Sequence, residues 1–495
     1  MSGRAIVDWT TGALLQGSRM LRTSRSVGPY GDSIHREGVQ RLLHSYRTIP
    51  ADAPVRLAKK TSNLFRARAE IDSPGLDVSG LGGVISVDEQ ARTADVAGMC
   101  TYEDLVDATL PYGLAPLVVP QLKTITLGGA VTGLGIESTS FRNGLPHEAV
   151  LEMDILTGNG EIITATPDGE HADLFRGFPN SYGSLGYATR LRIELEPVKP
   201  FVALRHLRFT SLVDLQSTLD RITAERVYAG IAVDYVDGVV FSADESYLTL
   251  GIQTVEAGPV SDYTDRNIFY QSIRHQSVNH PKTDRLTIRD YLWRWDTDWF
   301  WCSRAFGAQN PRIRRLWPKK LLRSSFYWKL IALDHKYSIA DRIEARKGNP
   351  PRERVVQDIE VPIERTHEFM QWFLDEIPIE PIWLCPLRLR DQSASYDPRR
   401  PWPLYPLEPK RTYVNIGFWS SVPVVRGEVE GAANRRIERK VAELDGHKSL
   451  YSDSYYSRDE FEKLYYGEGE YPALKDKYDP GSRLTDLFAK AVQRH

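Results

Sequence analysis

The sequence predicts an α+β protein with at least two domains. Strand-like and helix-like segments are mixed along the chain rather than strictly alternating, which favours α+β over α/β. With 495 residues, the chain is longer than a single hydrophobic core usually supports. Its apolar fraction of 41% and charged fraction of 26% are those of an ordinary globular protein.

The first clear elements lie between residues 83 and 113. Residues 83–96 (GVISVDEQARTADV) predict a strand, a polar turn and a second strand. Thr101 is expected to cap a helix, with Asp104 at the capping-box position. Apolar residues follow at helical spacing, and Gly113 lies just past the predicted end of the helix.

Further strands are predicted downstream. Residues 149–157 and 161–164 flank an Asn-Gly turn signal and predict a hairpin. Residues 187–196 and 412–419 read as strands, and the Pro-rich residues 398–410 as a long irregular connection.

Composition excludes several classes of protein. A net charge of −2 argues against a basic nucleic-acid-binding protein. Cys100, Cys302 and Cys385 are far apart and form no CxxC pair, so neither a disulfide framework nor a metal site is expected. The N-terminus lacks the apolar core of a signal peptide, and no apolar run approaches the roughly 20 residues that span a bilayer. We therefore expect a cytoplasmic protein.

The segment with the strongest chemical signal is residues 120–144, PQLKTITLGGAVTGLGIESTSFRNG. Glycines let backbone N–H groups approach a phosphate, and the interspersed hydroxyls can donate to phosphate or ring acceptors. The spacing matches neither the Rossmann nor the P-loop fingerprint. By itself, this segment is equally compatible with a purely structural loop.

The neighbouring motifs give the segment its meaning. It lies between a polar turn, RLAKKTSNL (56–64), and GSLG (183–186) followed by a strand. From about Ile49 to the C-terminus, the chain resembles the vanillyl-alcohol oxidase family of FAD-binding oxidoreductases, and most closely its Δ24-sterol reductase (seladin/Diminuto) branch. The stretches that carry this resemblance are residues 118–140, 173–195, 355–363, 381–389 and 449–461.

The resemblance implies a two-subdomain FAD-binding domain of the vanillyl-alcohol oxidase type plus an α+β cap domain over the substrate. Residues 1–198 would form the FAD domain, with an N-terminal extension to about residue 48. Residues 199–445 would form the cap, and residues 446–495 would return to the FAD domain.

The resemblance also places the cofactor. Members with covalent flavin carry a histidine in the pyrophosphate loop, which would be residues 59–63 here; this loop has none, so non-covalent FAD is expected. Lys59 and Lys60 would complement the phosphate charges, or else form a solvated surface pair. The expected FAD-binding residues are Lys59, Lys60, Thr61, Ser62, Asn63, Thr124, Thr126, Gly128, Gly129, Thr132, Gly133, Gly135, Ile136, Ser138, Gly144, Gly183, Ser184 and Gly186.

Reduction of an isolated alkene also needs an acid, because hydride does not add readily to an unpolarised C=C bond. The candidate acids are Glu137 in the glycine-rich segment, Asp296 or Asp298 between tryptophans, and Tyr413 or Tyr455 on later segments. Each has a structural alternative; Asp296 and Asp298 could pair with Arg294 and Arg304. Tyr413 shares one face of its strand with Asn415, and His447 is expected at the surface or in the core.

Residues 304–329 contain eight basic residues, no acidic one and several aromatic residues. This combination predicts either a surface that associates peripherally with an anionic membrane or an ordinary solvated helix face.

Three functions remain open. The favoured one is an FAD-dependent, NADPH- or NADH-dependent reductase of a lipid alkene. Its best substrate is a 10-methylene-stearoyl chain, as in bacterial flavoproteins that make 10-methylstearate, and a Δ24-sterol-type side chain is the alternative. The second is an FAD-dependent alcohol oxidase or dehydrogenase. The third is a flavin-free lipid-binding or scaffold protein.

Overall fold

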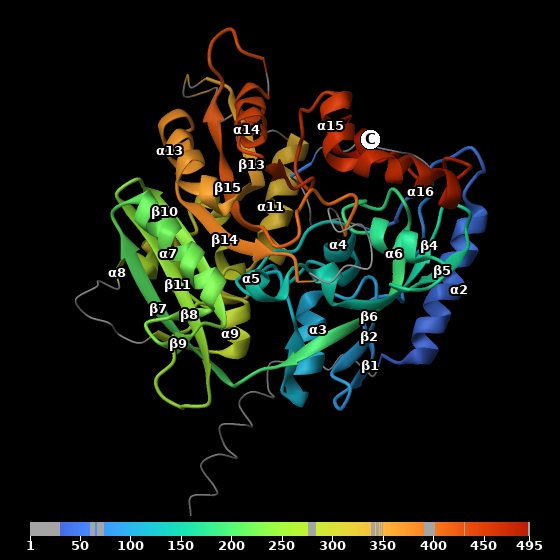
Figure 1. Ribbon diagram of the computed structural model, residues 1–495, viewed down its shortest axis with the longest axis horizontal. Coiled ribbons are helices and arrows are strands. Elements are labelled where there is room, and N and C mark those ends of the chain that lie inside the picture. The colour runs from blue at the N-terminus through green and yellow to red at the C-terminus, as the bar shows by residue number, and fades with distance from the viewer. Residues whose placement is uncertain are drawn as a thin grey trace, which may run out of the picture.

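The computed structural model describes residues 30–59, 65–66, 74–275, 284–337, 342, 346, 348, 350–390, 401–429 and 431–493. In that part of the chain, two main antiparallel sheets are accompanied by helices, which confirms the predicted α+β class (Figure 1).

The smaller of the two main sheets contains the strands predicted from residues 83–196. Its order is β1-β2-β6-β4-β5, with β3 paired to β6, and all its pairings are antiparallel. The predicted strand pair and hairpin are both present. The strands are β1 (Val84–Asp88), β2 (Thr93–Ala97), β3 (Leu114–Pro116), β4 (Val150–Leu156), β5 (Ile162–Ala165) and β6 (Tyr187–Pro197).

Helix α3 (Tyr102–Thr109) begins where the sequence predicts. The Thr101 hydroxyl accepts a hydrogen bond from the Asp104 backbone N–H at 3.2 Å and donates to the Asp104 carboxylate at 2.7 Å. A 3₁₀ turn follows, and Gly113 ends it with a φ of 68°, in the left-handed region that favours glycine.

The larger sheet has the order β12-β7-β11-β10-β14-β15-β13-β16, again antiparallel throughout. Its strands are β7 (Phe201–Phe209), β10 (Tyr235–Ser242), β11 (Glu245–Thr254), β12 (Asp284–Thr287), β13 (Arg352–Pro362), β14 (Ile382–Arg388), β15 (Thr412–Pro423) and β16 (His447–Lys448). The two short strands β8 (Val227–Tyr228) and β9 (Ile231–Ala232) form a separate pair.

One face of the larger sheet is covered by helices α7 (Leu212–Glu225), α13 (Thr366–Glu376) and α14 (Ala432–Glu443) (Figure 1). Their apolar residues form one buried core with alternate residues of the strands, including Val355, Ile359 and Val361 of β13. Because strand side chains alternate between faces, the intervening residues Asp358 and Glu360 lie on the opposite face.

The described part of the chain contains further α-helices before the C-terminal ones. They are α2 (Asp32–Thr48), α4 (Leu127–Thr132), α5 (Ser140–Asn143), α6 (Ala172–Gly177), α8 (Phe269–His275), α9 (Ile288–Leu292), α10 (Pro311–Leu316) and α11 (Ser324–Tyr337).

The C-terminal helices α15 (Arg458–Tyr465), α16 (Glu470–Tyr478) and α17 (Leu487–Ala491) follow the larger sheet in sequence, and α15 and α16 lie at the upper right of Figure 1. They contact the first part of the chain. Lys475 donates to the Ser184 carbonyl at 3.0 Å, and the Tyr478 hydroxyl donates to Asp173 at 2.8 Å.

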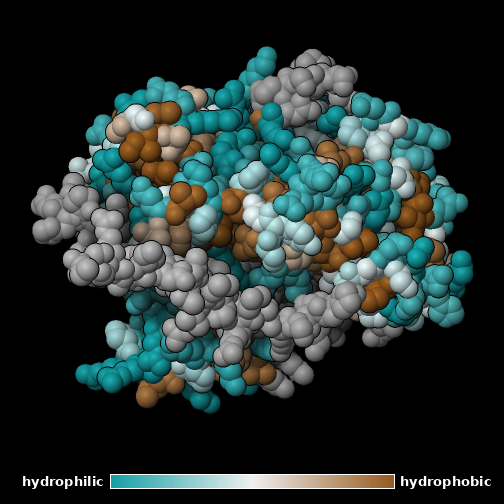
Figure 2. Space-filling view, turned by 90° about the horizontal axis from the view of Figure 1, so that it is seen from below, coloured by the Kyte–Doolittle hydropathy of each residue, from teal (hydrophilic) through white to brown (hydrophobic). Residues whose placement is uncertain are grey.

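The surface of the molecule is mixed in character. On the lower face, hydrophobic residues lie in small groups among hydrophilic ones (Figure 2). In the described part of the chain, no helix combines the length and the apolar character needed to cross a bilayer.

Candidate cofactor and active site

A cavity of about 960 Å³ lies between the glycine-rich segment and one face of the larger sheet. This is the upper end of the size range of cofactor and ligand pockets. The glycine-rich wall contains Thr124, Thr126, Gly128, Gly129, Thr132, Gly133, Gly135 and Ile136, and the aromatic wall contains Trp299, Phe300, Trp328, Trp383, Trp419 and Tyr451.

Backbone packing explains the glycines. Thr126 caps helix α4 by accepting a hydrogen bond from the Gly129 N–H at 3.3 Å. The Gly128 N–H donates to the Gly98 carbonyl at 3.0 Å, and a Cβ on Gly128 would lie only 2.6 Å from that carbonyl oxygen. A side chain at Gly128 would therefore push this wall of the cavity out of place.

Ten of the eighteen expected FAD-binding residues line the cavity: Lys59, Thr124, Thr126, Gly128, Gly129, Thr132, Gly133, Gly135, Ile136 and Gly183. Lys60, Thr61, Ser62 and Asn63 lie outside the described residues.

Four expected FAD-binding residues do not line the cavity. Ser138 is buried, with its hydroxyl 2.9 Å from that of Tyr291, and the Ser184 hydroxyl donates to a backbone carbonyl at 2.7 Å. Gly186 packs against β4, and Gly144 ends helix α5 with a φ of 69°. Backbone geometry and packing explain these four positions without a cofactor.

The predicted acids do not meet at the cavity. Glu137 is buried beside it, where its carboxylate accepts from the Ser138 hydroxyl at 2.5 Å and from Arg294 at 3.2 Å. Burial raises the pKa of Glu137, and the Arg294 charge opposes that shift. Because Arg294 also donates to Asp237 at 2.7 Å, this buried ion cluster joins the glycine-rich segment to strand β10.

Asp296 and Asp298 have structural partners, although not those expected from the sequence. Asp296 accepts from the Lys123 backbone N–H at 3.0 Å and from the Ser324 hydroxyl, not from Arg294. Asp298 pairs with Arg314 at 2.6 Å rather than with Arg304. The pairings that the sequence offered as an alternative are absent because Arg294 pairs with Glu137 and Asp237, and Arg304 donates to the Glu380 carbonyl.

The two tyrosine candidates also lie off the cavity wall. The Tyr413 hydroxyl accepts from the Glu408 backbone N–H at 3.3 Å. Tyr455 packs against Gly431, and its backbone N–H donates to Glu438. His447 is buried in the core beside Glu360.

A carboxyl that the sequence did not single out lines the cavity instead: Asp358, on the inner face of β13. Asn415 donates to it at 2.9 Å, and Tyr451 also hydrogen-bonds to it. Gly417, its direct partner on β15, leaves room for the carboxyl, since a Cβ there would lie 2.4 Å from Asp358 Oδ1. Burial raises the pKa of Asp358 to about 6, while its hydrogen bonds lower it. A carboxyl with this pKa can hold a proton near neutral pH.

Aromatic rings surround this acid. The Trp419 indole N–H donates to the Tyr451 hydroxyl at 2.9 Å, and its ring stacks on Phe300 at 4.4 Å between centroids. The ring centroids of Trp383 and Phe300 are 5.4 Å apart. Trp299 and Phe300 both have a positive φ, 44° and 53°, which costs bulky residues about 1–2 kcal/mol each. Ring contacts with Phe65, Trp295 and Trp419 hold these two adjacent aromatic residues in their strained conformation at the cavity wall.

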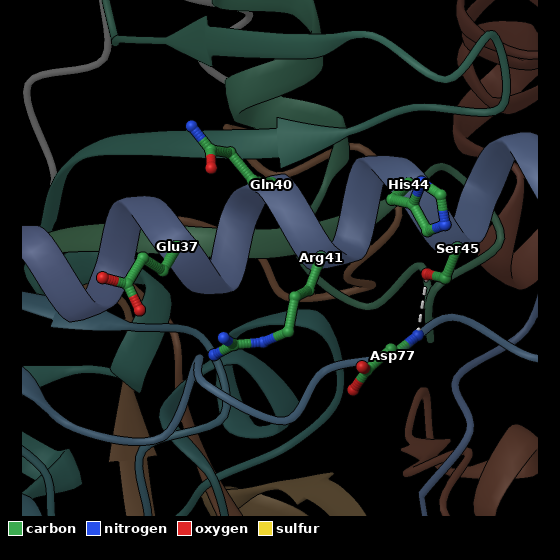
Figure 3. Close-up of a pocket in the computed structure, with 6 residues that line it drawn as sticks. All are labelled: Glu37, Gln40, Arg41, His44, Ser45 and Asp77. Atoms are coloured by element: carbon green, nitrogen blue, oxygen red, sulfur yellow. Dashed lines mark hydrogen bonds between the residues drawn. The ribbon is translucent and has the colours of Figure 1, made fainter.

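A second hollow lies on the surface along helix α2 and is lined by Glu37, Gln40, Arg41, His44, Ser45 and Asp77 (Figure 3). Its side chains are spread along the helix rather than converging, and the bond drawn between them runs from the Asp77 N–H to Ser45 at 2.9 Å. It is therefore not a candidate active site.

Comparison with known proteins shows what the chain is similar to. A profile of the FAD binding domain matches residues 39–166. Δ24-sterol reductase of Homo sapiens is 27% identical over 419 residues, covering 82% of this chain and 75% of that protein. The chain is an FAD-dependent oxidoreductase.

Two further relatives of this oxidoreductase show how far the similarity extends. Δ24-sterol reductase of Arabidopsis thaliana is 26% identical over 451 residues, covering 84% of this chain and 76% of that protein. Cytokinin dehydrogenase 9 of Oryza sativa subsp. japonica is 34% identical, but over 149 residues, or 30% of this chain and 27% of that protein. The resemblance to Δ24-sterol reductases found in the sequence is thereby confirmed.

The cavity of the oxidoreductase fits FAD. Gln121 lines it with a buried side chain whose amide nitrogen and oxygen both lack a hydrogen-bond partner. A ring system with donors and acceptors at its edge would satisfy both atoms. Around Gln121, the hydroxyl residues Thr124, Thr126 and Thr132 and the close-packed glycines also line the cavity.

Removing the Thr126 hydroxyl should weaken FAD binding modestly. Thr126→Ala deletes the cap of α4 and should cost about 1 kcal/mol, so we expect a loss of FAD affinity of about fivefold at most. FAD fluorescence titration measures it. Ser211→Ala is the matched control, because Ser211 caps α7 away from the cavity; an equal loss of affinity in the control would contradict a local role for Thr126.

Proposed function

We propose that this oxidoreductase reduces an isolated C=C bond in a lipid, converting a 10-methylene-stearoyl chain to a 10-methylstearoyl chain with NADPH or NADH as the reductant. The observation that carries the proposal is Asp358, a protonatable carboxyl on the aromatic wall of the cavity. The similarity of this chain to proteins named Δ24-sterol reductase also supports a reductase.

The aromatic wall can stabilise the positive charge that develops on the substrate during the reaction. Protonating the terminal carbon of a methylene branch leaves positive charge on the tertiary carbon. Bound FAD, once reduced by NADPH or NADH, would supply the hydride that this carbon accepts. The rings of Phe300, Trp383 and Trp419 can stabilise the developing charge by about 1–2 kcal/mol each in a desolvated site.

The chain's own residues manage the proton. Asp358 donates it to the alkene, and the hydrogen bonds from Asn415 and Tyr451 then stabilise the carboxylate. Trp419 donates to the Tyr451 hydroxyl and so fixes the tyrosine that contacts the acid. The rings around the acid keep water out, which preserves both the proton and the charge.

We prefer the acyl substrate over a sterol because of the segment of the chain that supplies part of the aromatic wall. Trp299, Phe300 and Trp328 lie in or beside residues 300–350. We infer from the sequence motifs that this segment is among the parts of the chain least like the eukaryotic sterol enzymes. Both alkenes would give a tertiary cation on protonation, so the acid and the rings serve either.

Lipid mass spectrometry of cells with and without the gene tests the substrate. We expect loss of the gene to remove 10-methylstearoyl lipids and to accumulate the 10-methylene precursor. Accumulation of a sterol-type alkene would replace the acyl assignment with the sterol one. An unchanged set of alkenes, together with peroxide production from an added alcohol by the purified protein, would favour the oxidase instead.

A further inference from the structure

We propose that Arg312, Ile313, Arg315, Leu316 and Lys320, hereafter the docking surface, seat the enzyme on a bilayer that contains anionic lipids. The proposal rests on the proposed lipid substrate for its purpose, but not for its test. The five residues belong to helix α10 and to the 3₁₀ turn that follows it, on the N-terminal side of α11.

The docking surface projects apolar side chains into solvent. Leu316 is 85% exposed, more than any other large apolar side chain in the described part of the chain, and Ile313 is 42% exposed. The two are three residues apart on one helix, so they lie on neighbouring positions of its surface. A single exposed apolar residue needs no explanation, but a pair beside unpaired cations is the pattern of an interfacial helix.

The basic residues of segment 304–329 divide into two groups. Arg314 is buried against Asp298, Arg323 pairs with Glu103 at 2.8 Å, and Lys319 pairs with Asp265. Three of these cations therefore pair with acidic side chains. Arg304 instead donates to the Glu380 backbone carbonyl at 3.0 Å.

The cations of the docking surface belong to the second group. Arg312, Arg315 and Lys320 are exposed, and none of them forms an ion pair with the residues that the structure describes. With no acidic residue between Arg304 and Lys329, this local excess of positive charge complements anionic head groups.

The same segment reaches the cavity. Trp299 and Cys302, before α10, and Ser324 and Trp328, after the turn, all line the cavity. Between these lining residues, the chain turns outward to expose Ile313 and Leu316. A bilayer bound to the docking surface would therefore lie beside a wall of the substrate pocket. An acyl chain could then pass from the bilayer into the pocket.

Vesicle co-sedimentation of the full-length, FAD-loaded protein tests the proposal. The probe is phosphatidylcholine vesicles with and without phosphatidylglycerol. The triple variant Arg312→Glu, Arg315→Glu, Lys320→Glu should lose affinity for the anionic vesicles by about a hundredfold. Leu316→Ser should weaken binding to the same vesicles without changing its dependence on salt.

The matched control is Arg47→Glu, Arg221→Glu, Arg439→Glu, which makes the same change in net charge at three exposed arginines on α2, α7 and α14. It should bind vesicles like the wild type. Equal losses in both triple variants, unchanged binding in the docking-surface variant, or binding to RNA in preference to anionic vesicles would overturn the proposal.

Measuring turnover on two forms of the lipid distinguishes a loss of membrane binding from a loss of catalysis. The docking-surface variant should keep its activity on detergent-dispersed lipid and lose it on vesicles. If detergent-dispersed lipid is not reduced even by the wild type, the proposed function fails, while the vesicle-binding result still stands or falls by itself.

Discussion

Asp358→Asn is expected to lower the rate of alkene reduction by about 10²- to 10⁴-fold, because it removes the carboxyl that we propose protonates the substrate. The asparagine is close to isosteric, so the cavity, the bound FAD and the reduction of that FAD by NADPH should be preserved. Stopped-flow absorbance measures both half-reactions separately. Only the half-reaction with lipid should slow.

Asp284→Asn provides the matched control. Asp284 is also a buried carboxylate, but it accepts a hydrogen bond from Tyr263 and is not a cavity-lining residue. If the two variants slow equally, Asp358 has no special role and the loss reflects buried-charge removal in general.

The pH dependence of the same half-reaction follows from the Asp358 pKa of about 6. Only the protonated carboxyl can donate, so the wild-type rate should fall as the pH rises through about 6 and should level off below it. Asp358→Asn should show no such step. A wild-type rate that instead rises with pH across this range would assign Asp358 the role of a base.

Gly128→Ala is expected to yield a protein that purifies without FAD. Its Cβ would lie 2.6 Å from the Gly98 carbonyl oxygen, a contact that the backbone must relieve by moving α4. Overpacking of this kind costs about 1–3 kcal/mol, and here the movement falls on the cofactor wall itself. The visible flavin absorbance per protein measures the outcome.

Gly82→Ala is the control for Gly128→Ala, because a Cβ there comes no closer than 3.9 Å to its neighbours. It should retain full flavin content. Full flavin content in Gly128→Ala as well would mean that the glycine-rich wall does not hold the cofactor.

The part of the fold that could be predicted from sequence is the part encoded locally. The Thr101 cap, the Asn-Gly hairpin and the alternation in β6 each depend on residues close together in the chain, and all three are present. The glycine-rich segment could also be predicted to line a cavity, because its residue types serve close backbone approach wherever the chain places them.

The acid could not be predicted, because it depends on strand register. Asp358 and Tyr451 are 93 positions apart and meet because β13 pairs with β15 and the chain returns beside β13, where the Ser449 N–H donates to the Asp358 carbonyl at 3.0 Å. Glu137 and Asp296 were chosen for their neighbours in sequence, but Arg294 and the Lys123 backbone bind them.

A signal for the acid was nevertheless present in the sequence. Asp358 stands in VVQDIEVPI, a strand-like apolar run in which a carboxylate is out of place unless it has a function or a partner. Tyr451 lies four residues before the candidate Tyr455, in the same motif. The motifs were therefore informative, and the choice of residue within them required the fold.

The central claim is that this oxidoreductase delivers hydride and a proton to a lipid alkene. Anaerobic single-turnover mixing of the NADPH-reduced enzyme with a 10-methylene-stearoyl phospholipid tests it most directly. The account predicts reoxidation of the flavin without oxygen and one 10-methylstearoyl product per flavin. A flavin that stays reduced until air is admitted, with the alkene recovered intact and peroxide formed, would contradict it.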